Sequence, residues 1–230
     1  MGLGMLPVII YLIGLDQDVY TYSNSTWREI RGEQEPKMLT IDPFGRLWSI
    51  SPNWYANFLN DNNIWTDYNN GKTGISLAVD SSGTPYMVSS DFYLHRGTRQ
   101  AWTLHNPKTP RCKVVAMDGE DNLWIIDLYG QIFFNVVGDQ WIEYPSDGRA
   151  VNLVVSRNGD PYIINSANQI YRGKMGKWEI MVGGLAKDIA VDSNGTLWAV
   201  GLDYKIWYLD DNEVWRRYGG AKKGSQIVVL

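Results

Sequence analysis

The sequence predicts an all-β protein: a six-bladed β-propeller of four-stranded antiparallel blades, in which the first and last strands of the chain share one blade. Three observations predict this fold. Short apolar runs alternate with turns rich in Gly, Asn and Asp, as in β-hairpins, and the apolar spacings of three and four residues that mark helices are absent. One unit of 37 to 39 residues repeats along the 230-residue chain. The two ends of the chain complete a unit together.

The unit is clearest between Trp178 and Trp215. The aliphatic run 187–192 is followed by Ser-Asn-Gly, the run 196–200 by Gly-Leu-Asp-Tyr, and the run 205–209 by Asp-Asp-Asn-Glu. Short strands separated by such turns indicate hairpins. With a further strand that opens at the Trp, the unit has four strands, which is the size of one propeller blade.

Aromatic residues stand at three recurring places in the units, and we expect them to pack between neighbouring sheets. The opening residues are Trp27, Trp65, Trp102, Trp141, Trp178 and Trp215. The second column is Tyr11, Trp48, Tyr86, Trp124, Tyr162 and Trp198. The third column is Tyr20, Phe58, Tyr93, Phe133, Tyr171 and Trp207. Such recurrence indicates a tandem array of one supersecondary unit.

The spacing from the second to the third aromatic is nine residues in four units, but ten in Trp48–Phe58 and seven in Tyr86–Tyr93. This difference predicts a long loop over residues 51–57 and a short one over 89–91. Six residues before the second aromatic, five units carry a polar side chain that we expect to cap a turn by accepting backbone N–H groups. These residues are Asp42, Asp80, Asp118, Ser156 and Asp192.

The ends of the chain indicate that the array closes into a ring. Residues 225–230 align with the first aliphatic run of the unit, and residues 8–27 align with the rest of it, down to a shared Gly-Leu-Asp. Repeats therefore begin at the six opening Trp residues, and residues 5–27 complete the last one. Closure removes the sheet edges that an open array would have to protect. We expect a single domain over residues 1–230.

Composition bears on partners and location. A net charge of −4 and a pI near 5.2 argue against a nucleic-acid partner. Cys112 is the single cysteine, so no disulfide can form within the chain, which favours a reducing, cytoplasmic location and leaves release without a signal peptide open. The apolar residues 1–15 lack a basic region, so we expect a strand there and no signal peptide or membrane insertion. The basic residues near the end are expected to be solvated: Arg216, Arg217, Lys222 and Lys223.

No residue pattern indicates catalysis or a bound metal. The two histidines, His95 and His105, lie in different units without a carboxylate pattern around them. Neither zinc-ligand spacing nor a nucleophile motif occurs. The Asp column could be read as a ring of metal ligands, but turn capping explains it better. The sequence therefore predicts a protein that is not an enzyme and has no cofactor.

The unit resembles the tectonin repeat, the β-propeller repeat of a group of lectins found in fungi, slime moulds and animals. The resemblance covers essentially the whole chain, and it rests on the Trp-to-Trp period, the Gly-x-Leu-Trp-x-Val hairpin and the aromatic in the third strand. It is best in residues 178–215, where Gly183-Gly184-Leu185 supplies the family's Gly-Leu step after the Trp. Tyr replaces the second-column Trp in three units, and Ser156 replaces the Asp in one.

The resemblance implies a multivalent carbohydrate-binding lectin of the cytoplasmic fungal type. It implies terminal sugars on microbial or invertebrate surface glycans as ligands, O-methylated sugars and lipopolysaccharide among them, and a role in innate defence. Several weak sites on one rigid body raise apparent affinity by roughly 10²–10⁴. A homo-oligomer is compatible with the sequence.

Candidate ligand-binding residues lie in the loops between second and third strands, because loops on a rigid scaffold carry many binding sites. They combine Asp, Asn and Gln with Tyr and Trp, a mixture that suits the hydroxyl groups and the apolar C–H face of a sugar. They are Asp16, Gln17, Asn53, Trp54, Asp91, Asp127, Tyr129, Asn165, Asn168, Gly201, Asp203 and Tyr204. A niche for a methyl group is expected at Gly201 with Leu202 and at Gly14 with Leu15.

Two other functions would use the same fold. A protein-interaction propeller would present one large apolar patch in place of several similar polar clefts. A propeller hydrolase with a metal in its central channel would need carboxylates that face inward. The innermost strands read MLTI, SLAV, KVVAM, NLVV, DIAV and QIVV, which are mostly apolar. The lectin is therefore the predicted function, and the protein-interaction propeller is the alternative.

Overall fold

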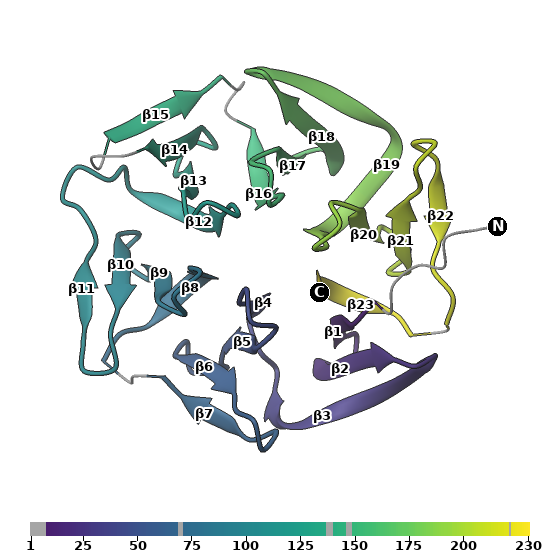
Figure 1. Cartoon of the computed structure of the whole chain (residues 1–230), viewed down its shortest axis with the longest axis horizontal. Helices are drawn as coiled ribbons and strands as arrows, with labels where there is room; N and C mark the ends of the chain where they lie inside the picture. The colour runs from purple at the N-terminus through teal and green to yellow at the C-terminus, as the bar shows by residue number, and fades with distance from the viewer. Residues whose placement is uncertain (1–7, 69–70, 137–139, 146–148, 221) are drawn as a thin grey trace.

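The computed structural model describes residues 8–68, 71–136, 140–145, 149–220 and 222–230, and its regular structure consists of strands β1 to β23. Figure 1 shows the sheets arranged around a central axis in a ring. The all-β prediction is confirmed, because the short apolar runs pair as antiparallel hairpins across their turns. Residues 5–7 of the predicted closing unit lie outside the described part of the chain. The described residues contain no helix long and apolar enough to cross a membrane.

Four of the sheets have four strands each. The sheet that joins the two ends of the chain has the order β23 (Gly224–Val229), β1 (Ile10–Gly14), β2 (Asp18–Ser23) and β3 (Thr26–Gln34). The next is β4 (Met38–Ile41), β5 (Leu47–Ile50), β6 (Ala56–Leu59) and β7 (Trp65–Asp67). It is followed by β8 (Gly74–Val79), β9 (Pro85–Ser89), β10 (Leu94–Gly97) and β11 (Trp102–Leu104). The fourth is β12 (Cys112–Met117), β13 (Leu123–Asp127), β14 (Ile132–Val136) and β15 (Gln140–Tyr144).

The remaining sheet has seven strands, where the sequence predicted two separate blades of four. It contains β16 (Ala150–Val155), β17 (Pro161–Asn165), β18 (Gln169–Lys174), β19 (Lys177–Val191), β20 (Leu197–Gly201), β21 (Ile206–Leu209) and β22 (Trp215–Arg217). β19 stays extended through the connection between two units. It pairs with β18 up to Leu185 and with β20 from Ala186 onward, so its two halves serve different neighbours.

The register of the strands corrects the predicted loop lengths. In the fourth sheet the third-column residue Phe133 pairs with Ile125, the residue after the second-column Trp124. Phe58 instead pairs with the second-column Trp48 itself, so it does not occupy the third-column position. The true third-column residues of these two units are Asn57 and His95, each nine residues after its second-column aromatic. The predicted long and short loops therefore have the same length as the others. A shift of one residue moves a side chain to the other face of the sheet, so aromatic type alone did not reveal the register.

The Asp residues before the second column cap turns, as predicted, and they also bind the second-column Trp. One carboxylate oxygen of Asp192 accepts two backbone N–H groups of its turn, both at 2.9 Å. The other oxygen accepts the indole N–H of Trp198 at 3.0 Å. The same bond joins Trp48 to Asp42 at 3.1 Å and Trp124 to Asp118 at 3.2 Å. These pairs lock each first hairpin to the aromatic core between sheets.

Trp27, Trp141 and Trp215 each lie in the outermost strand of a blade and contact the connection that leads into the innermost strand of that blade. A Cβ atom added to Gly184 would stand 3.0 Å from the indole of Trp215, and one added to Gly220 would stand 2.9 Å from that of Trp27. The glycines therefore let the connection pass close to the ring, which explains the Gly-Leu step of the best repeat. Trp141 instead donates a hydrogen bond to Thr109 Oγ1 on its connection, at 3.1 Å.

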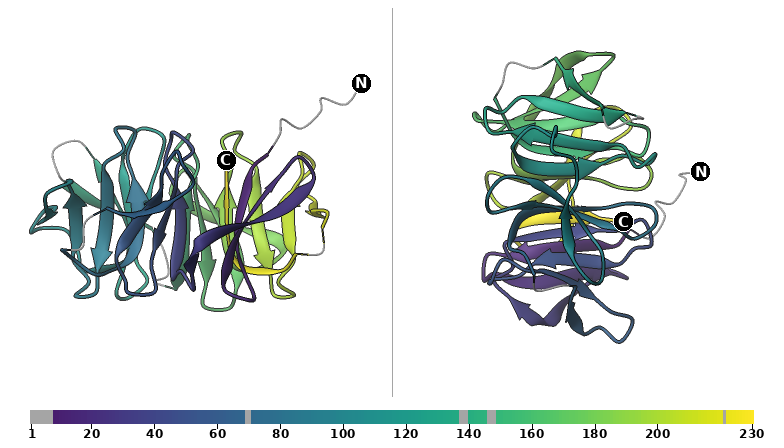
Figure 2. Two further views of the ribbon diagram at one scale, coloured as in Figure 1. Left: turned by 90° about the horizontal axis from the view of Figure 1, so that it is seen from below. Right: turned by 90° about the vertical axis from the view of Figure 1, so that its left-hand side faces the viewer.

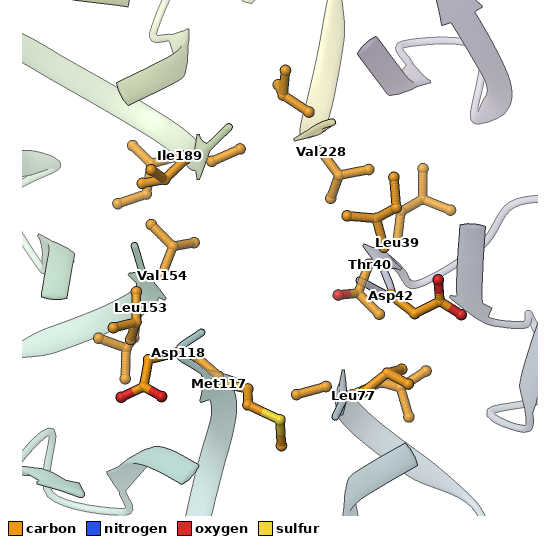
Figure 3. Close-up of a pocket in the computed structure, with 18 of the residues that line it drawn as sticks. Leu39, Thr40, Asp42, Leu77, Met117, Asp118, Leu153, Val154, Ile189 and Val228 are labelled. Atoms are coloured by element: carbon orange, nitrogen blue, oxygen red, sulfur yellow. The ribbon is translucent and has the colours of Figure 1, made fainter. Parts of the chain in front are cut away.

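The innermost strands surround a central cavity of about 410 Å³. Figure 3 shows apolar side chains such as Leu77, Leu153 and Val228 around it, with the carboxylates of Asp42 and Asp118 in the same ring. The mostly apolar wall agrees with the composition of these strands. The cavity is closed because strands from both ends of the chain, β1 and β23, pair with each other in one sheet of the ring. Figure 1 shows the C-terminus near the centre.

Polar side chains join neighbouring innermost strands around the central cavity. Gln226 on β23 accepts the N–H of Leu39 on β4 at 2.8 Å and donates to the carbonyl of the same residue at 3.2 Å. Asp188 on β19 accepts the N–H of Ile227 on β23 at 2.8 Å and the side-chain amide of Asn152 on β16 at 2.6 Å. These bonds tie β23 to both neighbouring sheets at the point where the ring closes.

Asp188 predicts a pH-dependent stability. Burial raises its pKa from 3.8 to about 7, although hydrogen bonds from Ile227 and Asn152 act in the opposite direction. Between these values the folded state binds more protons than the unfolded state, so this residue makes the free energy of unfolding fall as pH rises from about 4 to 7. Urea unfolding of the wild type and of Asp188→Asn, measured from pH 4.5 to 8, is expected to show this slope in the wild type alone. Parallel pH profiles for the two proteins would contradict the assignment.

Candidate functional site

The turns fall on two opposite faces of the ring, because successive strands of each sheet alternate in direction; Figure 2 shows the ring edge-on. With strands counted from the centre outward, the connection face carries the turns between second and third strands and the connections that lead into each innermost strand. The hairpin face carries the other turns. All the predicted ligand-binding residues lie on the connection face, in turns 14–17, 51–54, 89–92, 127–130, 165–168 and 201–204.

These six turns share one backbone structure. In each, the N–H of the fourth residue donates to the carbonyl of the first, at 2.8 to 3.3 Å, and the fourth residue has a positive φ. The carbonyl of the fourth residue accepts an N–H group from the connection into the next sheet. The donor–acceptor pairs are Glu35–Gln17, Gly74–Trp54, Cys112–Phe92, Ala150–Gly130, Ala186–Asn168 and Gly224–Tyr204. Each turn is thus fixed to its neighbouring sheet, and the same arrangement recurs around the ring.

Three of the fourth residues are aromatic and hold a conformation that suits glycine. Their φ angles are 68° at Trp54, 69° at Phe92 and 64° at Tyr204. A non-glycine residue in this region costs roughly 1–2 kcal/mol. The backbone bonds to the next sheet hold the residues there, so the fold keeps three aromatic rings at the connection face in spite of that cost.

Three of the predicted ligand residues are buried instead of exposed. Asp127 and Asn165 are the first residues of their turns, and the Oδ1 atom of each accepts two backbone N–H groups at 2.8 to 2.9 Å. Gly201 occupies the same place and is also buried. These residues shape the turns. The sequence did not distinguish them from exposed neighbours, because Asp and Asn are equally common as caps and as ligand contacts.

The second and third residues of all six turns are exposed. Asn53, Asp91 and Asp203 lie open to solvent, and Tyr129 is 82% exposed. The niches expected beside the glycines are filled by the chain itself: a Cβ atom on Gly201 would stand 2.8 Å from Asp203 Oδ1, and the corresponding space at Gly14 is taken by the carboxylate of Asp16. The side chains of the third residues thus fold back over the first.

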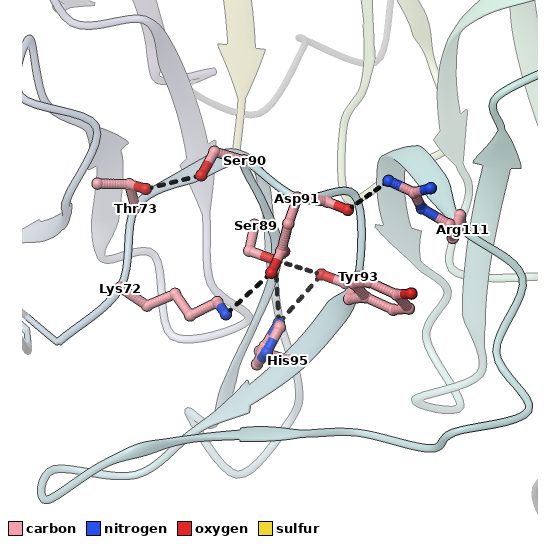
Figure 4. Close-up of polar contacts among 8 residues, drawn as sticks. All are labelled: Lys72, Thr73, Ser89, Ser90, Asp91, Tyr93, His95 and Arg111. Carbon is pink, nitrogen blue, oxygen red and sulfur yellow. Dashed lines mark hydrogen bonds and ion pairs between the residues drawn. The ribbon is translucent and has the colours of Figure 1, made fainter.

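A polar network surrounds Asp91 (Figure 4). Its carboxylate accepts a hydrogen bond from Ser89 and pairs with Lys72 at 3.3 Å, and its carbonyl accepts one from Arg111 Nη2 at 3.0 Å. The Ser89 bond and Lys72 hold the pKa of Asp91 below its usual value, against the opposing effect of partial burial. Lys72 comes from the connection into this sheet and Arg111 from the connection out of it. Two connections therefore meet at one turn.

His95 belongs to the same network, and its geometry does not match a catalytic triad. The Nδ1 atom of His95 lies 3.1 Å from the Tyr93 carbonyl and 3.2 Å from Ser89 Oγ. The carboxylate of Asp91 contacts the serine and not the imidazole, and Ser89 is 0% exposed, so its hydroxyl faces no substrate. Burial lowers the pKa of His95. No group of three or more His, Cys, Asp or Glu among the described residues could hold a metal ion.

The turn at Asp16 repeats this arrangement with different residues. Lys222 pairs with Asp16 at 3.2 Å and lies 3.2 Å from the centre of the Tyr20 ring, and the Tyr20 hydroxyl donates to Asp16 at 2.8 Å. Lys222 and Lys72 occupy equivalent places, two residues before the amide that bonds to the preceding turn. Sequence reasoning named Lys222 only as a solvated residue and did not name Lys72. It missed the Lys222–Asp16 pair because the acid and the base stand at opposite ends of the chain.

Comparison with known proteins places the fold. No protein-family model matches the chain, and no curated protein matches it. A streptogramin B lyase structure matches with a TM-score of 0.64 and 13% identity, over 93% of this chain and 80% of the other. A catalytically inactive virginiamycin B lyase from Staphylococcus aureus, solved with quinupristin, matches with a TM-score of 0.61 and 14% identity, over 95% and 86%. YCF48 bound to a D1 peptide matches with a TM-score of 0.55 and 16% identity, over 80% of this chain and 70% of the other.

The chain therefore has a β-propeller fold with repeated four-stranded blades. The prediction that it is not an enzyme is corrected by these matches, because two of the similar structures are lyases and the fold does not exclude catalysis. At 13% identity the likeness shows the fold alone and assigns no reaction. None of the three proteins is a tectonin, and the resemblance to that family stays a prediction.

Proposed function

We propose that the chain is a six-bladed β-propeller lectin that binds terminal sugars at the turns of its connection face. Two observations support a count of six blades. The two halves of β19 pair with different strands, and six turns have the same backbone hydrogen bonds. On this interpretation the seven-stranded sheet is two blades that share one unbroken strand.

The observation that carries the lectin proposal is the repetition of one turn with the same backbone bonds, each time with different side chains at its second, third and fourth positions, of which the second and third are exposed in every turn. Asn53 with Trp54, and Tyr129 beside Gly130, place an amide or a backbone group next to an exposed ring. A sugar needs both, since its hydroxyl groups form hydrogen bonds while its C–H face packs on an aromatic surface. Several related sites on one rigid ring would act together on clustered glycans. The defence role and the cytoplasmic location stay predictions.

The test is a glycan-array screen of the purified protein that includes methylated and bacterial sugars. We expect binding that one free monosaccharide competes away, and calorimetric stoichiometry above one ligand per chain. Absence of binding to every glycan by a folded protein would overturn the proposal.

Tyr129→Ala and Trp54→Ala are expected to weaken glycan binding by on the order of ten-fold each while leaving the melting temperature nearly unchanged. Both rings are exposed on the connection face, so their loss removes packing surface for a sugar and little core. Phe44→Ala is the matched control, since Phe44 is 69% exposed on the hairpin face. A Phe44→Ala protein that loses binding as strongly as the other two would place the site elsewhere.

The alternative is a protein-interaction propeller, which one observation favours. Leu128, Tyr129 and Val151 are exposed apolar residues that lie close together, because Ala150 donates its N–H to the carbonyl of Gly130 at 3.3 Å. Such a patch suits a peptide or protein partner, and YCF48, which matches the fold, was solved with a peptide. If the array is negative and a pull-down with Tyr129→Ala loses partners that the wild type retains, this alternative replaces the lectin.

A further inference from the structure

As described above, six backbone N–H groups at or shortly before the starts of the innermost strands donate to the fourth residues of the six connection-face turns. A basic residue lies within two positions of each of these six donors in the sequence. All six side chains are exposed or half-buried. They are Lys37, Lys72, Arg111, Arg149, Lys187 and Lys222. Because the six amides recur around the ring, these residues form a circle of positive charge on the connection face, which we call the cation circle.

The members of the cation circle have two kinds of partner. Lys72 and Lys222 pair with Asp91 and Asp16, as described above. Three others lie over aromatic rings of the connection face, which leaves the outward side of the charged group turned to solvent. These contacts are Lys37 to Trp54 at 5.9 Å, Arg111 to Tyr93 at 5.3 Å and Lys187 to Tyr204 at 4.6 Å. A cation held on a ring is positioned to accept an anion from above.

The recurring Asp residues of the hairpin face are not an exposed acidic counterpart of the cation circle, because Asp42, Asp80 and Asp192 are buried and accept backbone N–H groups of their own turns. The whole chain carries a net charge of −4, so the cations on the connection face stand out against an acidic molecule. Because Lys72 and Lys222 are paired with carboxylates, the members of the circle that can attract an anion are Lys37, Arg111 and Lys187, and exposed groups of one sign raise the local concentration of oppositely charged ligands.

We propose that the connection face binds acidic glycans, in which carboxylated sugars are held by the cation circle. This inference rests on the proposed lectin function and names the class of its ligand. A uronate residue would place its carboxylate on Lys37, Arg111 or Lys187 through a charge-assisted hydrogen bond, while its ring packs beside the aromatic residue under the cation. Repeated carboxylates along the glycan would engage several members of the circle at once.

The experiment compares a fluorescent oligogalacturonate with the same oligosaccharide after its carboxyl groups are reduced to alcohols. The wild type is expected to bind the acidic form at least about ten-fold more tightly, with an affinity that falls as salt is raised to about 0.5 M. The double variant Lys37→Glu/Lys187→Glu is expected to lose most of this preference.

The matched control is Lys174→Glu/Lys177→Glu, which makes the same change of net charge in an exposed turn of the hairpin face. It is expected to bind within about two-fold of the wild type, and circular dichroism checks that both variants are folded. Equal binding of acidic and neutral forms, independent of salt, overturns this inference and leaves the lectin standing. An equal loss of affinity for the acidic oligosaccharide in the two double variants also overturns this inference. Binding of poly-glutamate or DNA without binding of any glycan overturns the inference and the lectin together.

Discussion

Deletion of residues 224–230, which include the whole of β23, is expected to unfold the entire propeller and not only one sheet. β23 is the innermost strand of the sheet that joins the two ends, where it pairs with β1. Ile227 and Val229 on it are buried in one cluster with Ile10, Leu12 and Trp198. Its removal would open the ring, expose the edge of β1 and leave the cluster without one wall. The expected loss exceeds about 5 kcal/mol, a large part of the stability of a typical domain.

The measurement is far-UV circular dichroism with guanidinium unfolding of the truncated chain. A synthetic peptide of residues 222–230 added in excess is the control, and it is expected to restore a cooperative transition by completing the sheet. A truncated protein that unfolds cooperatively at the same midpoint as the full chain would show that ring closure contributes little.

Trp198→Phe is expected to lower the free energy of unfolding by about 2–4 kcal/mol. Trp198 is fully buried and packs against Tyr208 and Tyr218, with ring centres 5.4 and 5.0 Å apart. Phenylalanine fills less of this space and lacks the indole N–H, so one oxygen of the buried Asp192 loses its hydrogen-bond donor. Urea unfolding at pH 7 measures the effect.

Two further variants separate the hydrogen bond from the packing. Trp207→Phe is the control, because its indole N–H lies 3.4 Å from the exposed Asp203, and a loss under about 1 kcal/mol is expected. Asp192→Asn/Trp198→Phe is expected to be less destabilised than the sum of the single changes, since the hydrogen bond between these two side chains is lost in each single variant and is counted twice in the sum. Strict additivity would show that the indole bond carries no energy of its own.

Local patterns explain how much of the fold the sequence predicted. The hairpin turns, the repeat and the sharing of one sheet by both ends all follow from period, turn residues and apolar runs, which are properties of neighbouring residues. The Asp caps belong to the same group, because the carboxylate of Asp192 bonds to backbone groups only two and four residues away. For the candidate site, the same reasoning placed the predicted residues in turns of one face but did not separate buried capping residues from exposed ones.

The register of the paired strands could not be predicted from residues that are neighbours in the sequence. Phe58 and Tyr93 are aromatic residues near the expected place, and only the pairing across the sheet assigns the third column to Asn57 and His95. Two of the basic residues near the end, expected to be solvated, instead pair with carboxylates on different faces. Arg216 pairs with Asp210 on the hairpin side at 2.8 Å, whereas Lys222 reaches Asp16 on the connection face.

The sequence by itself determined the strands, the repeating unit and the closing of the ring. The strands and turns depend on side chains close together along the chain, and the closure followed because the two ends of the chain are complementary parts of one repeat. The tertiary structure decided the partner of Asp188, the network around Asp91 and the cation circle. Their members come from different repeats, and only the packing of six connections against six turns brings them to one face. Residues that are far apart in sequence acquire a common electrostatic role only when the backbone bonds between neighbouring sheets place them side by side.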